Sequence, residues 1–84
     1  MYMNDEKRAA FRAAYEKSLT DAYNRDPDRY AYPVTDVPRV VEKMLAELAL
    51  RGPLGINRNT PAWKAACRAC GVKNTAAEIE KFFL

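Results

Sequence analysis

The middle of the chain carries the pattern that most limits what the protein can fold into. Six apolar residues recur at the three- and four-residue spacing of one helix face, and they are Val37, Val40, Val41, Met44, Leu45 and Leu48. Thr35 or Asp36 can cap this helix, and Pro38 falls in its first turn, where the missing amide hydrogen breaks no bond. Gly52 and Pro53 end the pattern. The stretch therefore predicts a long amphipathic helix, which we expect to be the central helix of the core.

A long helix is also predicted before this one. Asn4 is a suitable cap, and the acidic residues Asp5 and Glu6 fall in the first turn, where the helix dipole favours negative charge. The apolar residues that follow at helical spacing are Phe11, Tyr15, Leu19 and Ala22. On the outer side we expect ion pairs between residues four apart, which are Arg12 with Glu16 and Lys17 with Asp21.

Residues 24–35 form a structured connector between the two long helices, because Pro27 and Pro33 exclude a continuous helix. Tyr30 and Tyr32 lie in this connector. We expect one or both rings to cover the edge of the core. The alternative is that they stack on a base or on a partner protein.

Two short helices are predicted toward the C-terminus. Thr60 and Pro61 start the first of them, because threonine accepts a hydrogen bond from a free amide and proline is preorganised at the first position. This helix runs to Cys70 and stops at Gly71. Thr75 begins a capping box, so the second short helix starts there and continues to the end of the chain.

Several apolar residues near these short helices lie outside a simple helix face. In the loop that follows Pro53 we expect Leu54 and Ile56 to tuck inward while Arg58 points outward. The last helix carries too many apolar residues for one narrow face, so one of its rings is exposed or meets a second chain. Phe83 is the candidate hydrophobic anchor for a partner or for a homodimer.

Together these patterns predict an all-α fold in which residues 1–84 form a single small domain. It has two longer N-terminal helices and two short C-terminal helices joined by a glycine turn. The composition, with 49% hydrophobic and 30% charged residues, is that of a globular chain. The N-terminus has no apolar signal segment and no stretch is long enough for a membrane span, so we expect a cytoplasmic protein.

Positive charge is concentrated in the C-terminal half. Residues 39–84 hold eight basic and four acidic side chains, a net charge of +4, whereas residues 1–38 hold six and seven, a net charge of −1. Between Leu48 and Ala77 there is no acidic residue and there are five basic ones, Arg51, Arg58, Lys64, Arg68 and Lys73. We expect the last four to converge beside the helix start at Thr60 and to bind phosphate or carboxylate. The alternative is a basic surface that is merely solvated.

Other kinds of site have little support in the sequence. Cys67 and Cys70 have the spacing of a metal or redox pair, but the chain has no other cysteine and no histidine. They share one helix face with Trp63 and Ala66, so we interpret them as small core residues and expect no metal and no cofactor. Without histidine, with Ser18 as the only serine and with no glycine-rich phosphate loop, we expect no enzymatic activity.

One segment of the chain has a resemblance to known proteins. The stretch from Asn59 through Trp63 and Cys70 to Phe83 is similar to the C-terminal part of short uncharacterised helical proteins of temperate phages and prophages. The connector Tyr32-Pro33-Val34 and its following helix add to the likeness. The resemblance implies a mobile-element origin and the class of small stoichiometric inhibitors of host machinery, anti-CRISPR proteins among them, and it implies no functional residues.

The sequence leads to two hypotheses about function. The first is a non-enzymatic binding protein that blocks a host protein or a protein–nucleic-acid complex through its basic C-terminal surface. The electrostatic contact would come from all five basic residues, which are Arg51, Arg58, Lys64, Arg68 and Lys73. The second is a helix-turn-helix-like DNA-binding regulator that uses the same basic residues, with the turn at Gly71 and Val72. The second hypothesis has a weakness, because Glu78 and Glu80 on the would-be recognition helix repel phosphates.

Overall fold

The computed structural model describes all 84 residues and contains helices but no strand. The four α-helices are α1 (Asp5–Arg25), α2 (Val37–Arg51), α3 (Pro61–Ala69) and α4 (Ala76–Phe83). Three short 3-10 turns join them, η1 (Pro27–Arg29), η2 (Val34–Asp36) and η3 (Pro53–Gly55). The all-α prediction of two longer and two shorter helices is confirmed. No helix combines the length and the apolar composition that a membrane span requires.

Three of the four helices begin at the side-chain caps that the sequence predicts. The side chain of Asn4 accepts a hydrogen bond from the Lys7 amide at 3.1 Å. Thr60 does the same for the Trp63 amide, and Thr75 for the Glu78 amide, each at 3.2 Å. Each cap satisfies an amide that has no partner within its helix, which stabilises the first turn.

The start of α2 differs from the prediction. Neither Thr35 nor Asp36 caps this helix with its side chain. The Asp36 carboxylate instead accepts a hydrogen bond from Arg39 at 2.8 Å. The turn η2 runs directly into α2, so the chain is already turning when the helix begins and a side-chain cap is replaced by backbone bonds.

The glycine stops are confirmed. Gly52 follows α2 with a φ of 77°, and Gly71 follows α3 with a φ of 68°, a region that side chains with a Cβ rarely enter. The Gly52 amide donates to the Leu48 carbonyl at 2.8 Å, which closes the last turn of α2.

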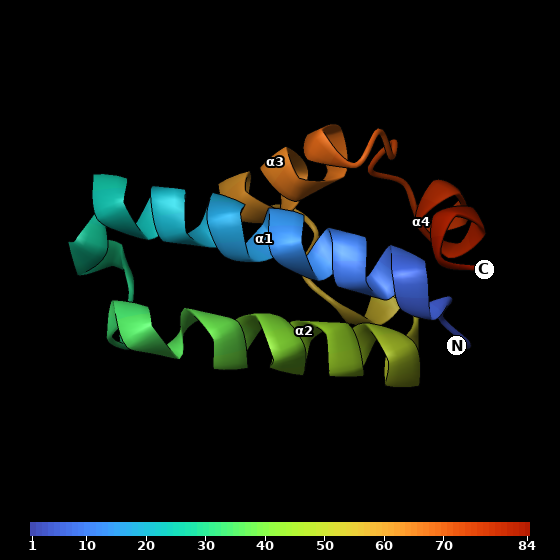
Figure 1. The fold of residues 1–84 in the computed structure, drawn as a ribbon, viewed down its shortest axis with the longest axis horizontal. Helices are drawn as coiled ribbons and strands as arrows, with labels where there is room; N and C mark the ends of the chain where they lie inside the picture. The colour runs from blue at the N-terminus through green and yellow to red at the C-terminus, as the bar shows by residue number, and fades with distance from the viewer.

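The central helix of the core is α1, not α2 as the sequence predicts. Figure 1 shows α1 in the middle of the molecule with α2 along one side and α3 along the other, and α4 lies near its N-terminal end. The Trp63 ring of α3 is fully buried against α1, with ring centroids 4.8 Å from Phe11 and 5.5 Å from Tyr15. The apolar face of α2 is as buried as predicted, but its main partner among the α-helices is α1. The length of α1 lets it carry contacts to all three of the other helices.

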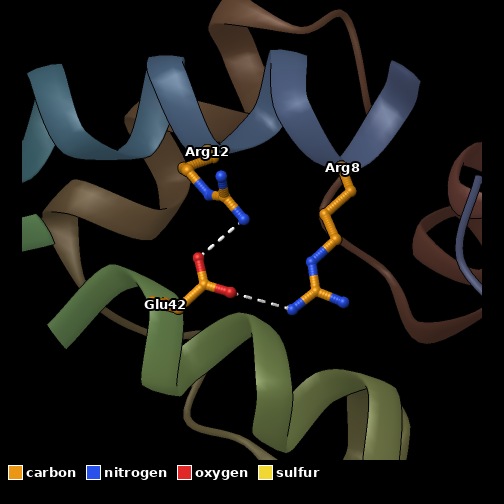
Figure 2. A network of polar contacts seen from close by, with 3 residues as sticks. All are labelled: Arg8, Arg12 and Glu42. Carbon is orange, nitrogen blue, oxygen red and sulfur yellow. Dashed lines mark hydrogen bonds and ion pairs between the residues drawn. The ribbon is translucent and has the colours of Figure 1, made fainter. Parts of the chain in front are cut away.

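An ion-pair network joins α1 and α2. Figure 2 shows the Glu42 carboxylate of α2 between two arginines of α1, with one oxygen 3.2 Å from Arg8 and the other 2.6 Å from Arg12. The predicted pair of Arg12 with Glu16 is therefore wrong, because helix packing brings a different acid within reach. The predicted pair of Lys17 with Asp21 is confirmed at 3.0 Å.

The loop after α2 and the end of α4 correct two further predictions. Leu54 does not tuck inward and is 83% exposed, because η3 turns Pro53 into the core in its place, while Ile56 is half-buried. Phe83 is fully buried in the core, so its prediction as an exposed anchor is wrong. The neighbouring Phe82 is half-buried, and the Lys7 ammonium lies 5.0 Å from its ring centroid.

Candidate anion-binding site

Four cationic side chains line one open hollow of about 500 Å³. We call them the basic cluster, and they are Arg25, Arg29, Lys64 and Arg68. The other lining residues are Asn59, Pro61 and Ala65, so no acidic side chain faces this hollow. A hollow of single-sign charge raises the local positive potential and attracts anions.

Helix packing holds the two halves of the basic cluster together. Arg25 ends α1 and Arg29 ends η1, whereas Lys64 and Arg68 stand one helix turn apart on α3. The buried Trp63 lies next to Lys64 in the chain and packs α3 onto α1, which brings the two pairs to the same hollow. Thr60 starts α3 at this position, so the positive end of the α3 dipole also lies here.

None of the four cluster residues forms an ion pair. Elsewhere the basic side chains of Arg8, Arg12, Lys17, Arg39 and Arg51 each lie within 4.0 Å of a carboxylate. Like charges held near one another repel, and an anion between them relieves that repulsion. The arrangement is therefore suited to bind an anion rather than to stabilise the fold.

The structure brings together only part of the predicted basic patch. Lys64 and Arg68 share the hollow. Arg51 lies at the C-terminal end of α2, where it pairs with Glu47 at 3.2 Å. Lys73 is exposed in the turn after α3 and does not line the hollow.

Arg58 has a structural position that the sequence did not indicate. It is half-buried rather than pointing outward, and its guanidinium donates to the Pro53 carbonyl at 3.0 Å and to the Asn74 carbonyl at 3.3 Å. The Asn74 amide returns a bond to the Arg58 carbonyl at 3.0 Å and accepts one from the Trp63 indole at 2.9 Å. Arg58 therefore ties the loops on either side of α3 together, and its charge is used within the fold.

Arg25 and Arg29 are the cluster members that sequence reasoning missed. They lie in the acid-rich N-terminal half, where Asp26 and Asp28 next to them mask their charge in any count along the chain. Their spacing of four residues around Pro27 was the only available signal. Their position beside Lys64 depends on the packing of α3 against α1, which no local pattern shows.

The two cysteines are free thiols with a packing role. Cys67 is buried in the core and Cys70 is half-buried against it. Burial, followed by the neighbouring Cys70, raises the pKa of Cys67 to about 11, and burial also raises the pKa of Cys70. Both side chains are therefore protonated at neutral pH, which makes them poor nucleophiles. No three His, Cys, Asp or Glu side chains gather as they would around a metal ion.

A second surface, which we call the apolar end, lies away from the basic cluster. Its exposed side chains are Tyr2, Leu50, Leu54 and Leu84, each at least 68% exposed. The Met1 ammonium donates to the Ala49 carbonyl, and the Asn4 amide donates to the Phe83 carbonyl at 2.6 Å, so the two termini meet the end of α2 here. In Figure 1 both termini lie at the end of the molecule opposite the α1–α2 connector.

Comparisons of the chain with protein-family models, with curated proteins and with solved structures found no match. The geometry and charge of the basic cluster are therefore the main indication of function.

Proposed function

We propose that this protein is a non-enzymatic binding protein that holds a phosphate-bearing partner on the basic cluster. The observation that carries the proposal is the set of four cations, Arg25, Arg29, Lys64 and Arg68, around one hollow that contains no acid. The bound protein would act by covering the surface of its partner, because this mode of action needs no reacting group at the site.

The composition of the basic cluster suits an oxyanion, and the spacing of the anionic groups decides which partner fits it best. Three of its four members are arginines, whose planar guanidinium presents parallel donors to the oxygens of phosphate and of carboxylate alike. An acidic protein surface offers carboxylates scattered at irregular spacing, whereas a nucleic acid offers phosphates in a regular row. A nucleic acid, free or within a protein–nucleic-acid complex, is therefore the partner we propose.

A helix-turn-helix mode of binding is less favoured. In that mode α4 would enter a DNA groove, but α4 packs against η3 and the N-terminal end of α1, and it carries Glu78 and Glu80 on exposed positions. Its buried residues Ile79 and Phe83 hold it to the core. In our proposal α3 and the end of α1 contact the phosphates instead. Inhibition of host machinery by a mobile-element protein stays a prediction from the sequence resemblance.

The test is a fluorescence anisotropy titration of labelled nucleic acid at increasing salt. We expect the logarithm of the association constant to fall linearly with the logarithm of salt concentration, with a slope of about −0.7 to −0.9 per neutralised phosphate. The double variant Lys64→Glu/Arg68→Glu should bind at least about 100-fold more weakly, because it places two acids in the hollow.

The matched control carries the same change in net charge outside the hollow. Lys73→Glu/Lys81→Glu alters two exposed lysines that do not line it, and we expect its affinity to stay within about threefold of the parent protein at physiological salt. An equal loss in the two double variants would mean that net charge alone drives binding. Affinity for nucleic acid that does not depend on salt would contradict the proposal.

A further inference from the structure

An aromatic hollow adjoins the basic cluster. It encloses about 160 Å³, and its lining includes the side chains of Tyr15, Tyr30, Tyr32 and Val40. A cavity of about 150 Å³ accepts a benzene-sized ring. We call it the tyrosine hollow, and its size and lining suit one planar ring.

The tyrosine hollow and the basic cluster form one continuous surface. Both are lined by Arg29 and Pro61, and a third hollow lined by Arg25, Arg29 and Tyr30 connects them. Asp26 also lines this connecting hollow, so a bound phosphate is expected on the side of Lys64 and Arg68. A ligand that carries a ring next to a phosphate matches this order of groups.

Positive charge also continues on the other side of the tyrosine hollow. A further hollow is lined by Tyr32, Arg39, Val40 and Lys43. Arg39 is paired with Asp36, but Lys43 forms no ion pair. Cations therefore lie on both sides of the tyrosine hollow, as a strand with phosphates on either side of the bound base would require. A single free nucleotide would contact the cations on one side only.

The tyrosines are held in place before any ligand binds. Tyr23 stacks on Tyr30 with centroids 5.1 Å apart and an interplanar angle of 21°, and its hydroxyl donates to the Tyr32 carbonyl at 2.7 Å. Burial, followed by the neighbouring Tyr30 and Tyr23, raises the pKa of Tyr32, so its hydroxyl adds no negative charge near a phosphate at neutral pH. A preorganised aromatic site lowers the entropy lost on binding.

We propose that a single-stranded nucleic acid binds along this surface, with one unstacked base in the tyrosine hollow and its flanking phosphates on the basic cluster and at Lys43. The inference rests on the proposed function and adds the chemical form of the partner. Duplex bases are stacked and paired, so they cannot enter a ring-sized hollow, whereas single-strand recognition commonly uses aromatic stacking beside a basic groove.

The test compares three labelled probes of equal length, about 12 nucleotides, on the parent protein. They are an oligothymidine, an abasic strand that keeps the phosphates without the bases, and a duplex. We expect the oligothymidine to bind at least about tenfold more tightly than the abasic strand, since one stacked base contributes roughly this much. This comparison needs no variant, so it holds even if a substitution disturbs the fold.

A variant then assigns the effect to the tyrosine hollow. Tyr32→Leu should reduce the affinity for oligothymidine to within about threefold of the abasic strand and leave abasic binding unchanged. The control Tyr2→Leu alters a tyrosine that is 74% exposed at the apolar end, and it should bind all three probes as the parent protein does.

Three results would overturn the inference. The first is equal affinity for oligothymidine and the abasic strand. If Lys64→Glu/Arg68→Glu then abolishes binding of both strands, the proposed function still holds and only the base-binding inference fails. The second is tighter binding of the duplex. The third is binding of free thymidine monophosphate as tightly as the strand, which would assign the surface to a small ligand. Absence of binding to every probe would refute the proposed function as well.

Discussion

Two pairs of arginines on and just beyond α1 have the same spacing and opposite surroundings. Arg8 and Arg12 face Glu42 of α2, which has an oxygen within 3.2 Å of each of them. Arg25 and Arg29 face Lys64 and Arg68 at the other end of the helix and have no acid in an ion pair. At the first place arginine charge joins two helices, and at the second it is left available.

The difference shows that the role of an arginine in this fold depends on its position. Arginines at one end of α1 form ion pairs, and those at the other end do not. Ion pairs at partly exposed positions each contribute only about 0.2–1 kcal/mol, but they remove cations from any role in binding. Four unpaired cations in one hollow contribute repulsion to the folded state instead. A local cost in stability of this kind is typical of binding sites.

The largest expected effect comes from removing the side chain that holds α3 on α1. Trp63→Ala should lower the free energy of unfolding by about 3–5 kcal/mol, since it removes a fully buried ring and leaves a cavity. Urea denaturation followed by circular dichroism measures this loss. Trp63→Phe keeps a six-membered ring but loses the indole bond to Asn74 and part of the buried ring volume, so its loss should be smaller, about 1–3 kcal/mol. Equal losses in the two variants would mean that the buried ring of residue 63 does not hold α3 on α1.

Alkaline pH should weaken the core at Cys67 and Tyr15. Burial raises the pKa of Cys67 from 9.0 to about 11 and that of Tyr15 from 10.0 to about 12. The unfolded chain therefore releases these protons at lower pH, so the contribution of the two groups to stability is constant well below pH 9 and is lost as the pH rises toward 11. We expect a loss of roughly 2 kcal/mol at pH 11 from Cys67, measured by urea denaturation at each pH. In Cys67→Ala the loss of stability that we attribute to Cys67 should disappear. An unchanged pH profile would show that the buried thiol is not its cause.

Removing the shared acid should make the first arginine pair resemble the second. Glu42→Gln leaves Arg8 and Arg12 without their partner, and the free energy of unfolding should fall by about 1 kcal/mol. Glu16→Gln is the matched control, because Glu16 forms no ion pair although the sequence predicts one with Arg12. Its effect should stay below about 0.5 kcal/mol. The reverse order of the two losses would mean that Arg12 pairs within its own helix.

The smallest effect is expected from giving the basic cluster an acid. Asn59 lines the hollow just before the start of α3, so Asn59→Asp places a carboxylate near Lys64 and the positive end of the helix. We expect about 0.5 kcal/mol of added stability at low salt, with weaker anion binding. Thermal denaturation at low and at about 1 M salt checks the cause, because screening should remove the gain. A gain that survives high salt would require a different explanation.

The sequence is sufficient to predict the four helices, but it does not predict which helices pack against one another. Local signals at Asn4, Thr60, Thr75, Gly52 and Gly71 marked the helix ends, because caps and left-handed turns depend on residues a few positions apart. The choice of α1 as the central helix could not be made this way. Apolar spacing shows which face of a helix is buried, but not which other helix covers it.

The candidate site shows the same limit. The sequence predicts Lys64 and Arg68 because they lie one turn apart on a predicted helix. It does not predict Arg25 and Arg29, because these two residues reach the hollow only through tertiary packing. Charge along the chain predicts Arg58 in the patch, although its guanidinium donates hydrogen bonds to two backbone carbonyls. The sequence predicts Phe83 as an exposed anchor, although the ring is fully buried, because a stripe of apolar residues does not show which ring is covered.

The side chain and backbone of Asn74 have a consequence for how fast the site can respond to a partner. Three hydrogen bonds at this residue link the loop after α3 to Trp63 and to Arg58 before it, so α3 cannot rotate about its axis without breaking them. Motion of Lys64 and Arg68 is then mainly that of their exposed side chains, whose rotamers interconvert in picoseconds to nanoseconds. Encounter with an anion should therefore be limited by diffusion and electrostatic steering rather than by rearrangement of the backbone.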